Sequence, residues 1–204
     1  MATSLIYRNS SLYELAMILL YGRHYGERYR AVADLIPEGS SVVDLCCGPA
    51  VLYQRYLRSK SVAYTGLDIN SRFIAGLVRR GGTGRVFDLR SDESLPSADY
   101  LIMQASLYHF LPDASGVLER MLAAAKKSVI IAEPIRNLAT SNSRLLSLIG
   151  RIFTNSGAGE HRLRFTEATL SQFFSRYSSR VVTRFTIAGG REQIYVLKPG
   201  VQSD

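Results

Sequence analysis

Three aspartates, Asp44, Asp68 and Asp88, each follow a short run of β-branched and other apolar residues. Such runs predict strands, and the carboxyl ends of parallel strands form the crevice in which an open sheet binds its ligand. A carboxylate after the second strand can accept hydrogen bonds from two ribose hydroxyls, and one after the third can accept from an adenine amino group. Gly48, in the turn after the first strand, allows the backbone to approach a ligand closely. A single aspartate there more often caps the following helix, but three at equivalent strand ends favour a binding site.

Groups that could move a proton follow the later strands. Tyr108 and His109 lie just beyond the fourth apolar run, and His161 lies in a basic stretch further along. Each is a candidate general base, with a structural or capping role as the alternative. Glu133 ends the fifth run, where it could orient an amine acceptor or cap the segment that follows it.

Metal binding is not expected. The three histidines are scattered and the two cysteines, Cys46 and Cys47, are adjacent, so no set of tetrahedral ligands has the required spacing. Adjacent cysteines also rarely form a disulfide, which favours a reducing compartment, and we expect a cytoplasmic location.

The elements that would position these groups alternate between strand and helix, which predicts a parallel α/β sheet covered on both faces. Gly189 and Gly190 separate the last two strands as a hairpin turn, so the sheet should finish with an antiparallel strand. The expected helices span about 10–22, 25–36, 51–57, 71–80 and 112–126, and the expected strands span 41–45, 62–67, 85–87, 100–103, 128–132, 181–188 and 193–197.

The 204 residues are 47% apolar and 21% charged, which excludes disordered and collagen-like classes. We expect one domain over 1–204, with 1–40 as a helical cap. No apolar run approaches the ~20 residues of a membrane span, and no signal peptide is recognisable. Of the net charge of +8, most lies in residues 134–204, where 10 Lys and Arg stand against 4 Asp and Glu. Such an excess can attract nucleic acid, phosphorylated substrates or an anionic membrane surface.

Four segments in order resemble motifs of class I S-adenosylmethionine-dependent methyltransferases. Val42 to Ala50 (VVDLCCGPA) is similar to the first motif, although Cys46 and Ala50 stand where the family usually has glycine. The second, third and fourth motifs are matched by 64–70, 87–89 and 98–111. The resemblance covers about residues 25–198. It implies a Rossmann-like, mostly parallel sheet of seven strands with a C-terminal antiparallel hairpin and helices on both faces.

The resemblance also implies that S-adenosyl-L-methionine is the cofactor and assigns roles to its neighbours. Asp44 and the backbone of 46–48 would face the methionine part, with the Gln104 carbonyl near its amino group. Asp68 would hold the ribose, and Ile69 would pack on the adenine. The residues that complete this cofactor-binding set are Cys46, Cys47, Gly48, Asp88, Leu89 and, in the N-terminal segment, Tyr25.

The fourth motif bears on the acceptor. Methyltransferases of nucleic-acid base amines usually carry Asn/Asp-Pro-Pro-aromatic there, whereas this chain has Gln104-Ala105-Ser106-Leu107. A small organic or lipid-like acceptor is therefore favoured and nucleic acid is disfavoured. The alternatives are a nucleic-acid or ribosome-linked methyltransferase and a non-catalytic nucleotide-binding member of the fold, although 46–51 lacks the Gly-x-Gly-x-x-Gly of nicotinamide binders.

Residues 135–165 are expected to cover the acceptor. Within 143–153 apolar side chains recur at helical spacing, and arginines lie on another face. Because this segment leaves the crevice end of the fifth strand, it predicts an acceptor with an apolar body and a negative group, and it would permit peripheral contact with an anionic membrane. Arg162 and Arg164 are the arginines expected to affect the acceptor.

Overall fold

The computed structural model describes residues 10–136, 163–187 and 189–200. Its seven strands form one sheet in the order β3-β2-β1-β4-β5-β7-β6. The first five are parallel, β7 is antiparallel to β5, and β6 is antiparallel to β7. The strands are β1 (Ser41–Leu45), β2 (Ala63–Asp68), β3 (Thr83–Val86), β4 (Ala98–Gln104), β5 (Ala125–Pro134), β6 (Val181–Ile187) and β7 (Glu192–Leu197). The predicted α/β fold, with its antiparallel C-terminal hairpin, is confirmed.

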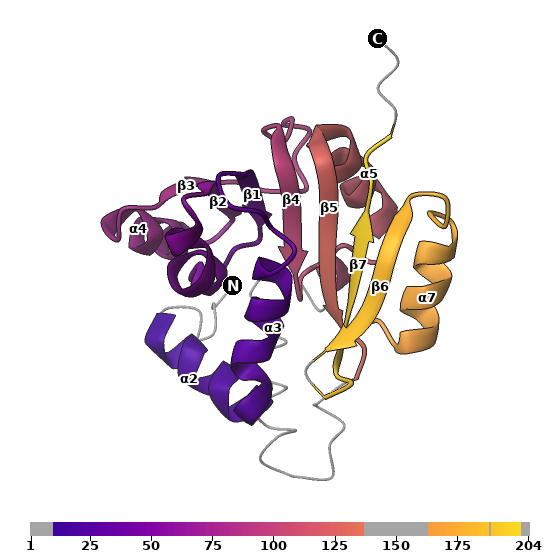
Figure 1. Ribbon diagram of the computed structural model, residues 1–204, viewed down its shortest axis with the longest axis horizontal. Coiled ribbons are helices and arrows are strands. Elements are labelled where there is room, and N and C mark those ends of the chain that lie inside the picture. Colours follow the sequence, from indigo (N-terminus) through magenta and orange to yellow (C-terminus); the bar gives the residue numbers. More distant parts are fainter. Residues whose placement is uncertain (1–9, 137–162, 188, 201–204) are drawn as a thin grey trace.

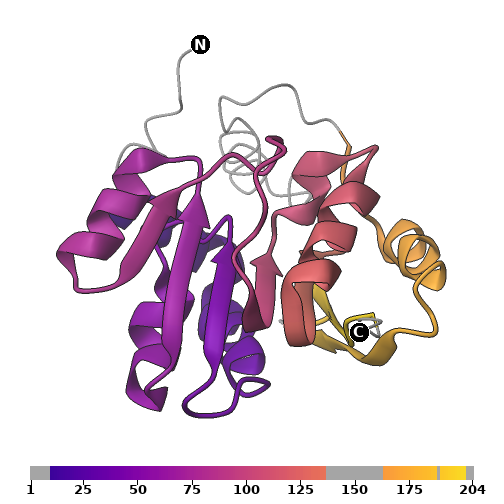
Figure 2. The ribbon, with the colours of Figure 1, turned by 90° about the horizontal axis from the view of Figure 1, so that it is seen from above.

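Helices cover both faces of the sheet (Figure 1). One apolar cluster joins α2 (Ser10–Tyr21), α3 (Tyr25–Ala33) and the segment 51–57 to one face, and Ile102 and Ile130 are among its strand residues. The other cluster joins α5 (Ala114–Ala124) and α7 (Glu167–Ser175) to the opposite face. The remaining helix, α4 (Ser71–Arg79), packs beside β2 and β3 at one edge, as the view from above also shows (Figure 2).

Several predicted boundaries were wrong. The helix expected to reach residue 126 ends at Ala124, because Ala125 already pairs with Ala98 of β4 and the following lysines continue β5. The helix expected over 25–36 ends at Ala33. The one expected over 51–57 is α-helical only at 51–52, and continues as a π-turn over Tyr53–Leu57 and a 3-10 turn over Arg58–Lys60. Sheet pairing and packing override local helix propensity at these ends.

The carboxyl ends of β1, β2, β4 and β5 meet at one end of the sheet, the lower end in Figure 1, beside which α2 and α3 lie. As the sequence predicts, the connection between β3 and β4 contains no helix in its described residues 87–97. The predicted cover over 135–165 lies almost wholly outside the described residues. No helix in the described ranges is both long and apolar enough to cross a bilayer.

Candidate functional site

Asp68 ends β2 and joins two crevice turns. Its Oδ2 accepts a hydrogen bond from the Gly48 N–H at 2.8 Å, and its Oδ1 accepts one from the Asn70 N–H at 2.8 Å. Burial raises the pKa of the carboxyl, while these two N–H groups act in the opposite direction. Each oxygen keeps a second lone pair, so the carboxylate is oriented by the backbone and can still accept from a ligand.

The turn after β1 has an unusual backbone. Cys46, Gly48 and Ala50 have φ values of +55°, +55° and +56°, in the left-handed region that favours glycine. Non-glycine residues in such conformations cost about 1–3 kcal/mol each and cluster at functional sites. A Cβ placed on Gly48 would meet no other atom within 4 Å. The turn therefore borders open space, although the family's usual glycines are absent at positions 46 and 50.

Asp44 lies deeper than Asp68. Its Oδ2 accepts a hydrogen bond from the Tyr64 hydroxyl at 2.8 Å, and the side chain is buried. Burial raises the pKa of Asp44 to about 7, against the opposing effect of the Tyr64 hydroxyl. Cys47, in the neighbouring turn, is half-buried, and its thiol contacts the Gly48 carbonyl oxygen at 3.6 Å. Asp44 is thus held by Tyr64 of β2, just before the turn.

The residues assigned to the adenine side lie at the adjacent strand ends. Ile69 follows β2 with 55% of its surface exposed, which is unusual for an isoleucine and leaves its side chain able to contact a flat apolar group. Asp88 is exposed after β3 and accepts from the Arg90 N–H at 2.9 Å, while Leu89 is buried. The structure therefore brings Asp68, Ile69 and Asp88 to the same end of the sheet.

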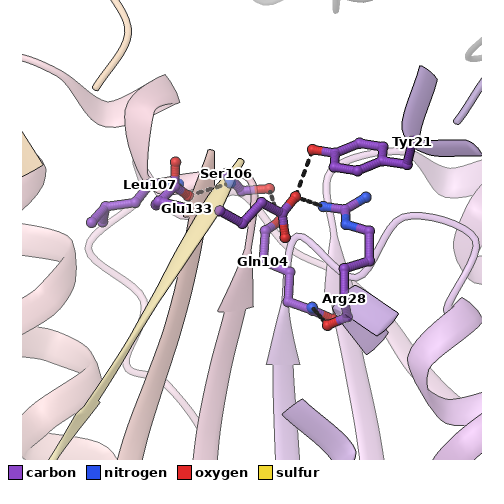
Figure 3. A network of polar contacts seen from close by, with 7 residues as sticks. Tyr21, Arg28, Gln104, Ser106, Leu107 and Glu133 are labelled. Atoms are coloured by element: carbon purple, nitrogen blue, oxygen red, sulfur yellow. Dashed lines mark hydrogen bonds and ion pairs between the residues drawn. The ribbon is translucent and has the colours of Figure 1, made fainter. Parts of the chain in front are cut away.

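The turn after β4 is held by Glu133, at the end of β5. Oε1 of Glu133 accepts from the backbone N–H groups of Ser106 and Leu107, both at 2.6 Å, as Figure 3 shows. Ala105, in the same turn, also has a left-handed φ of +49°. The Glu133 side chain is 0% exposed, and this burial raises its pKa to about 8. Glu133 therefore has a capping role, but the segment that it caps is the turn after β4 and not, as predicted, the segment that follows Glu133.

A buried polar network ties the N-terminal helices to this end of the sheet (Figure 3). Oε1 of Glu192, the first residue of β7, accepts from the Tyr21 hydroxyl at 2.5 Å and pairs with the Arg28 guanidinium at 2.7 Å. The Arg28 carbonyl oxygen in turn accepts from the Gln104 side-chain amide at 3.2 Å. Gln104 is thereby fixed from α3. Sequence reasoning missed this network, since its charged partners lie 164 positions apart with no local pattern.

The remaining candidates differ in their surroundings. Tyr108 is buried in a 3-10 turn, and the half-buried His109 lies beside it, with 4.0 Å between ring centroids. Tyr25 packs edge-on against Tyr29, with its hydroxyl 3.4 Å from Glu14. His161 lies outside the described residues. Within the described part of the chain, no group of three or more His, Cys, Asp or Glu side chains could hold a metal ion.

Solved structures confirm the fold. A chain from the complex of the Haloferax volcanii Trm112 methyltransferase activator with a candidate methyltransferase has a TM-score of 0.68 at 15% identity, covering 98% of this chain and 100% of that one. Magnesium protoporphyrin IX methyltransferase (ChlM) from Synechocystis, with bound SAH, has a TM-score of 0.60 at 17% identity, covering 85% and 80%. The 16S rRNA methyltransferase RmtF, in complex with S-adenosyl-L-homocysteine, has a TM-score of 0.61 at 19% identity, and the match covers 93% of this chain and 65% of that one.

These likenesses establish the class I S-adenosylmethionine-dependent methyltransferase fold, as the motifs imply. The names of these proteins range from a porphyrin methyltransferase to a ribosomal RNA methyltransferase, so the fold alone identifies no acceptor. A search of curated protein sequences finds no match. A family model described as methionine biosynthesis protein MetW matches residues 26–152, well over half of the chain, and the match spans the first five strands, β1 to β5. The chain therefore belongs to the MetW family.

Proposed function

We propose that this chain binds S-adenosyl-L-methionine at the carboxyl ends of β1, β2 and β4 and transfers its methyl group to a small organic acceptor. The observation that carries the proposal is the Asp68 carboxylate, whose two oxygens are aimed by the Gly48 and Asn70 N–H groups. Beside it lie the exposed Ile69 side chain and the open space in front of Gly48. A carboxylate for ribose hydroxyls, an apolar surface for adenine and a turn that is open at Gly48 together fit this cofactor.

When bound, the cofactor supplies a methyl group on a sulfonium, which is already an activated leaving group. The work left to the protein is alignment, which can lower a barrier by on the order of 7–11 kcal/mol. Asp68 would orient the ribose. Gln104 is held by Arg28 and would present its backbone carbonyl to the methionine amino group. Tyr108 and His109, next to the Glu133-bonded turn, are the proposed groups for any proton that the acceptor must lose.

Support for a small acceptor comes from the turn after β4. Glu133 occupies the N–H groups of Ser106 and Leu107, and the sequence there lacks the Pro-Pro-aromatic pattern of base-amine methyltransferases. The residues at this turn are thus committed to a compact, buried arrangement rather than to a platform for a flipped base.

The test is titration calorimetry with S-adenosylhomocysteine on Asp68→Asn. The substitution removes the negative charge from two hydrogen bonds worth about 1.5–3 kcal/mol each, so affinity should fall tenfold or more. Asp99→Asn is the matched control, because Asp99 lies at the amino end of β4 and bonds the Ser41 N–H. Equal affinities for Asp68→Asn and the parent chain would end the assignment. Tight cofactor binding without methyl transfer to any metabolite would instead favour a non-catalytic member of the fold.

A further inference from the structure

Four buried side-chain oxygen atoms have no hydrogen-bond partner among the described residues, Glu192 Oε2 and the Tyr195 hydroxyl among them. Two of the four belong to directly opposed residues at the crevice end of the sheet. They are Oε2 of Glu133 and Oε1 of Gln193. The side chains are 0% and 6% exposed. A buried acceptor that is left unpaired destabilises the fold, because it loses the hydrogen bond that water gives it in the unfolded chain. Two such atoms next to a candidate site therefore indicate a ligand that donates hydrogen bonds.

The two oxygens belong to neighbouring side chains. Glu133 of β5 pairs directly with Gln193 of β7 in antiparallel register, and opposed residues in such a pair point to the same face with Cβ atoms about 4.5–5.5 Å apart. The face is the one that packs against α5 and α7, since Ile131 and Tyr195, two residues away on each strand, belong to that cluster. One donor group could bond both oxygens.

A positive charge lies beside this pair. The guanidinium of Arg164 stacks on the Tyr108 ring, 3.4 Å from its centroid. It is close enough to Glu133 to act electrostatically on that carboxyl. In the described ranges no carboxylate lies within ion-pair distance of Arg164. A stacked guanidinium with its edge unpaired suits a carboxylate or phosphate.

We propose that Glu133 and Gln193 bind an amino group of the methyl acceptor, and that Arg164 binds an anionic group of the same molecule. This inference rests on the proposed function and names its substrate class: a small amine that also carries a carboxylate or phosphate. The ammonium would donate to Glu133 Oε2 and Gln193 Oε1, while Glu133 Oε1 keeps its bonds to the turn after β4.

Binding of the ammonium is coupled to a proton. Burial and the nearby Glu192 carboxylate keep Glu133 protonated at neutral pH, against the effects of Arg164 and the two N–H groups, since its pKa is about 8. An arriving ammonium displaces this proton to the buffer, so affinity for an amine should rise as pH approaches 8. The competing explanation is that the Glu133 proton simply bridges to Gln193 and no ligand is involved.

Three matched probes separate these explanations, each titrated with saturating S-adenosylhomocysteine: L-norleucine, hexanoate without the amine, and pentylamine without the carboxylate. The readout is the amide NMR signals of Ser106 and Leu107, which bond Glu133. Glu133→Gln keeps an Oε1 atom that can accept from both backbone amides. It replaces the unpaired Oε2 by an NH₂ group, which can donate a hydrogen bond to Gln193 Oε1. It should lower the affinity for norleucine and pentylamine at least tenfold and leave that for hexanoate unchanged.

Arg164→Met should give the complementary pattern, weakening norleucine and hexanoate but not pentylamine. Glu38→Gln, the same substitution at an exposed glutamate before β1, is the control for Glu133→Gln and should alter nothing. If S-adenosylhomocysteine binds but no amine probe does, or if Glu133→Gln binds amines as the parent chain does, the inference fails while the proposed function stands. If S-adenosylhomocysteine itself does not bind, the proposed function fails first.

Discussion

At the scale of single residues, the crevice carboxyls differ in how their burial is compensated. Asp68 receives a backbone N–H on each oxygen. Asp44 receives the Tyr64 hydroxyl, and Glu133 receives two N–H groups on one oxygen. Burial favours the protonated form of a carboxyl, and hydrogen bonds to the charged form oppose it. Asp44 and Glu133, whose pKa values are raised to about 7 and about 8, are therefore neutral or partly neutral near physiological pH.

These raised pKa values make the stability of the fold depend on pH. Because the folded pKa values lie above the ordinary 3.8 and 4.5, the stabilisation is fully present below those values and is lost as pH rises through about 7 and 8. Glu133→Gln and Asp44→Asn remove these titrations and keep an oxygen acceptor. The difference in unfolding free energy between each variant and the parent chain should therefore shift in favour of the variant by more than about 1 kcal/mol between pH 5 and pH 8.

Urea denaturation at pH 5, 6.5 and 8 measures this difference, with Glu38→Gln as the exposed control. If the difference in unfolding free energy between variant and parent is the same at all three pH values, Asp44 and Glu133 are ionised in the native state.

At the scale of elements, the Arg28–Glu192 pair connects α3 to the start of β7, and the Tyr21 hydroxyl adds the end of α2. The Arg28 and Glu192 side chains are 2% and 0% exposed. Removing one member of a buried pair leaves an uncompensated charge and costs about 3–5 kcal/mol. Since Gln104 is bonded to the Arg28 carbonyl oxygen, displacement of α3 should also disturb the cofactor end.

Glu192→Ala should therefore lose about 3–5 kcal/mol of unfolding free energy and bind S-adenosylhomocysteine less tightly. Arg28→Met combined with Glu192→Leu should recover most of the stability. The exposed Arg85–Glu93 pair is the control, and Glu93→Ala should cost less than about 1 kcal/mol. Chemical denaturation measures both losses of unfolding free energy. If Glu192→Ala loses no more than Glu93→Ala, the network does not hold α3 in place.

Some helices and strands were predictable from the sequence and others were not. The succession of strands along the chain, the antiparallel ending of the sheet and the acidic strand ends were predictable, because hydrophobic runs and glycine turns mark the strands of an alternating chain. The end of α5 was not predictable from the sequence, because Ala125 and Lys126 favour a helix locally. They belong to a strand only because β5 pairs with β4. The partners of Glu133 and Glu192 depend on long-range packing that no local pattern encodes.

At the scale of the whole molecule, part of the basic charge lies away from the candidate site. Lys198 and Arg180 are adjacent, joined by a backbone hydrogen bond where β7 ends and β6 begins. Arg176 follows α7 just before this point. Because β7 runs against β5, its last residue pairs near the start of β5, at the end of the sheet opposite the crevice. RNA attracted to these residues would not bring a nucleotide to Asp68.

We therefore expect any RNA affinity to be non-specific and separable from the site. Changing Arg176, Arg180 and Lys198 together to Gln should reduce the slope of log affinity against log salt by about 2, since each phosphate contact on a single strand contributes about 0.7. Fluorescence anisotropy of a labelled oligouridine over a salt series measures this slope. Affinity for S-adenosylhomocysteine should stay the same, because the three residues lie at the far end of the sheet. A triple variant that loses cofactor binding, or methyl transfer to RNA that disappears with it, would make this surface part of the acceptor site and favour a nucleic-acid substrate.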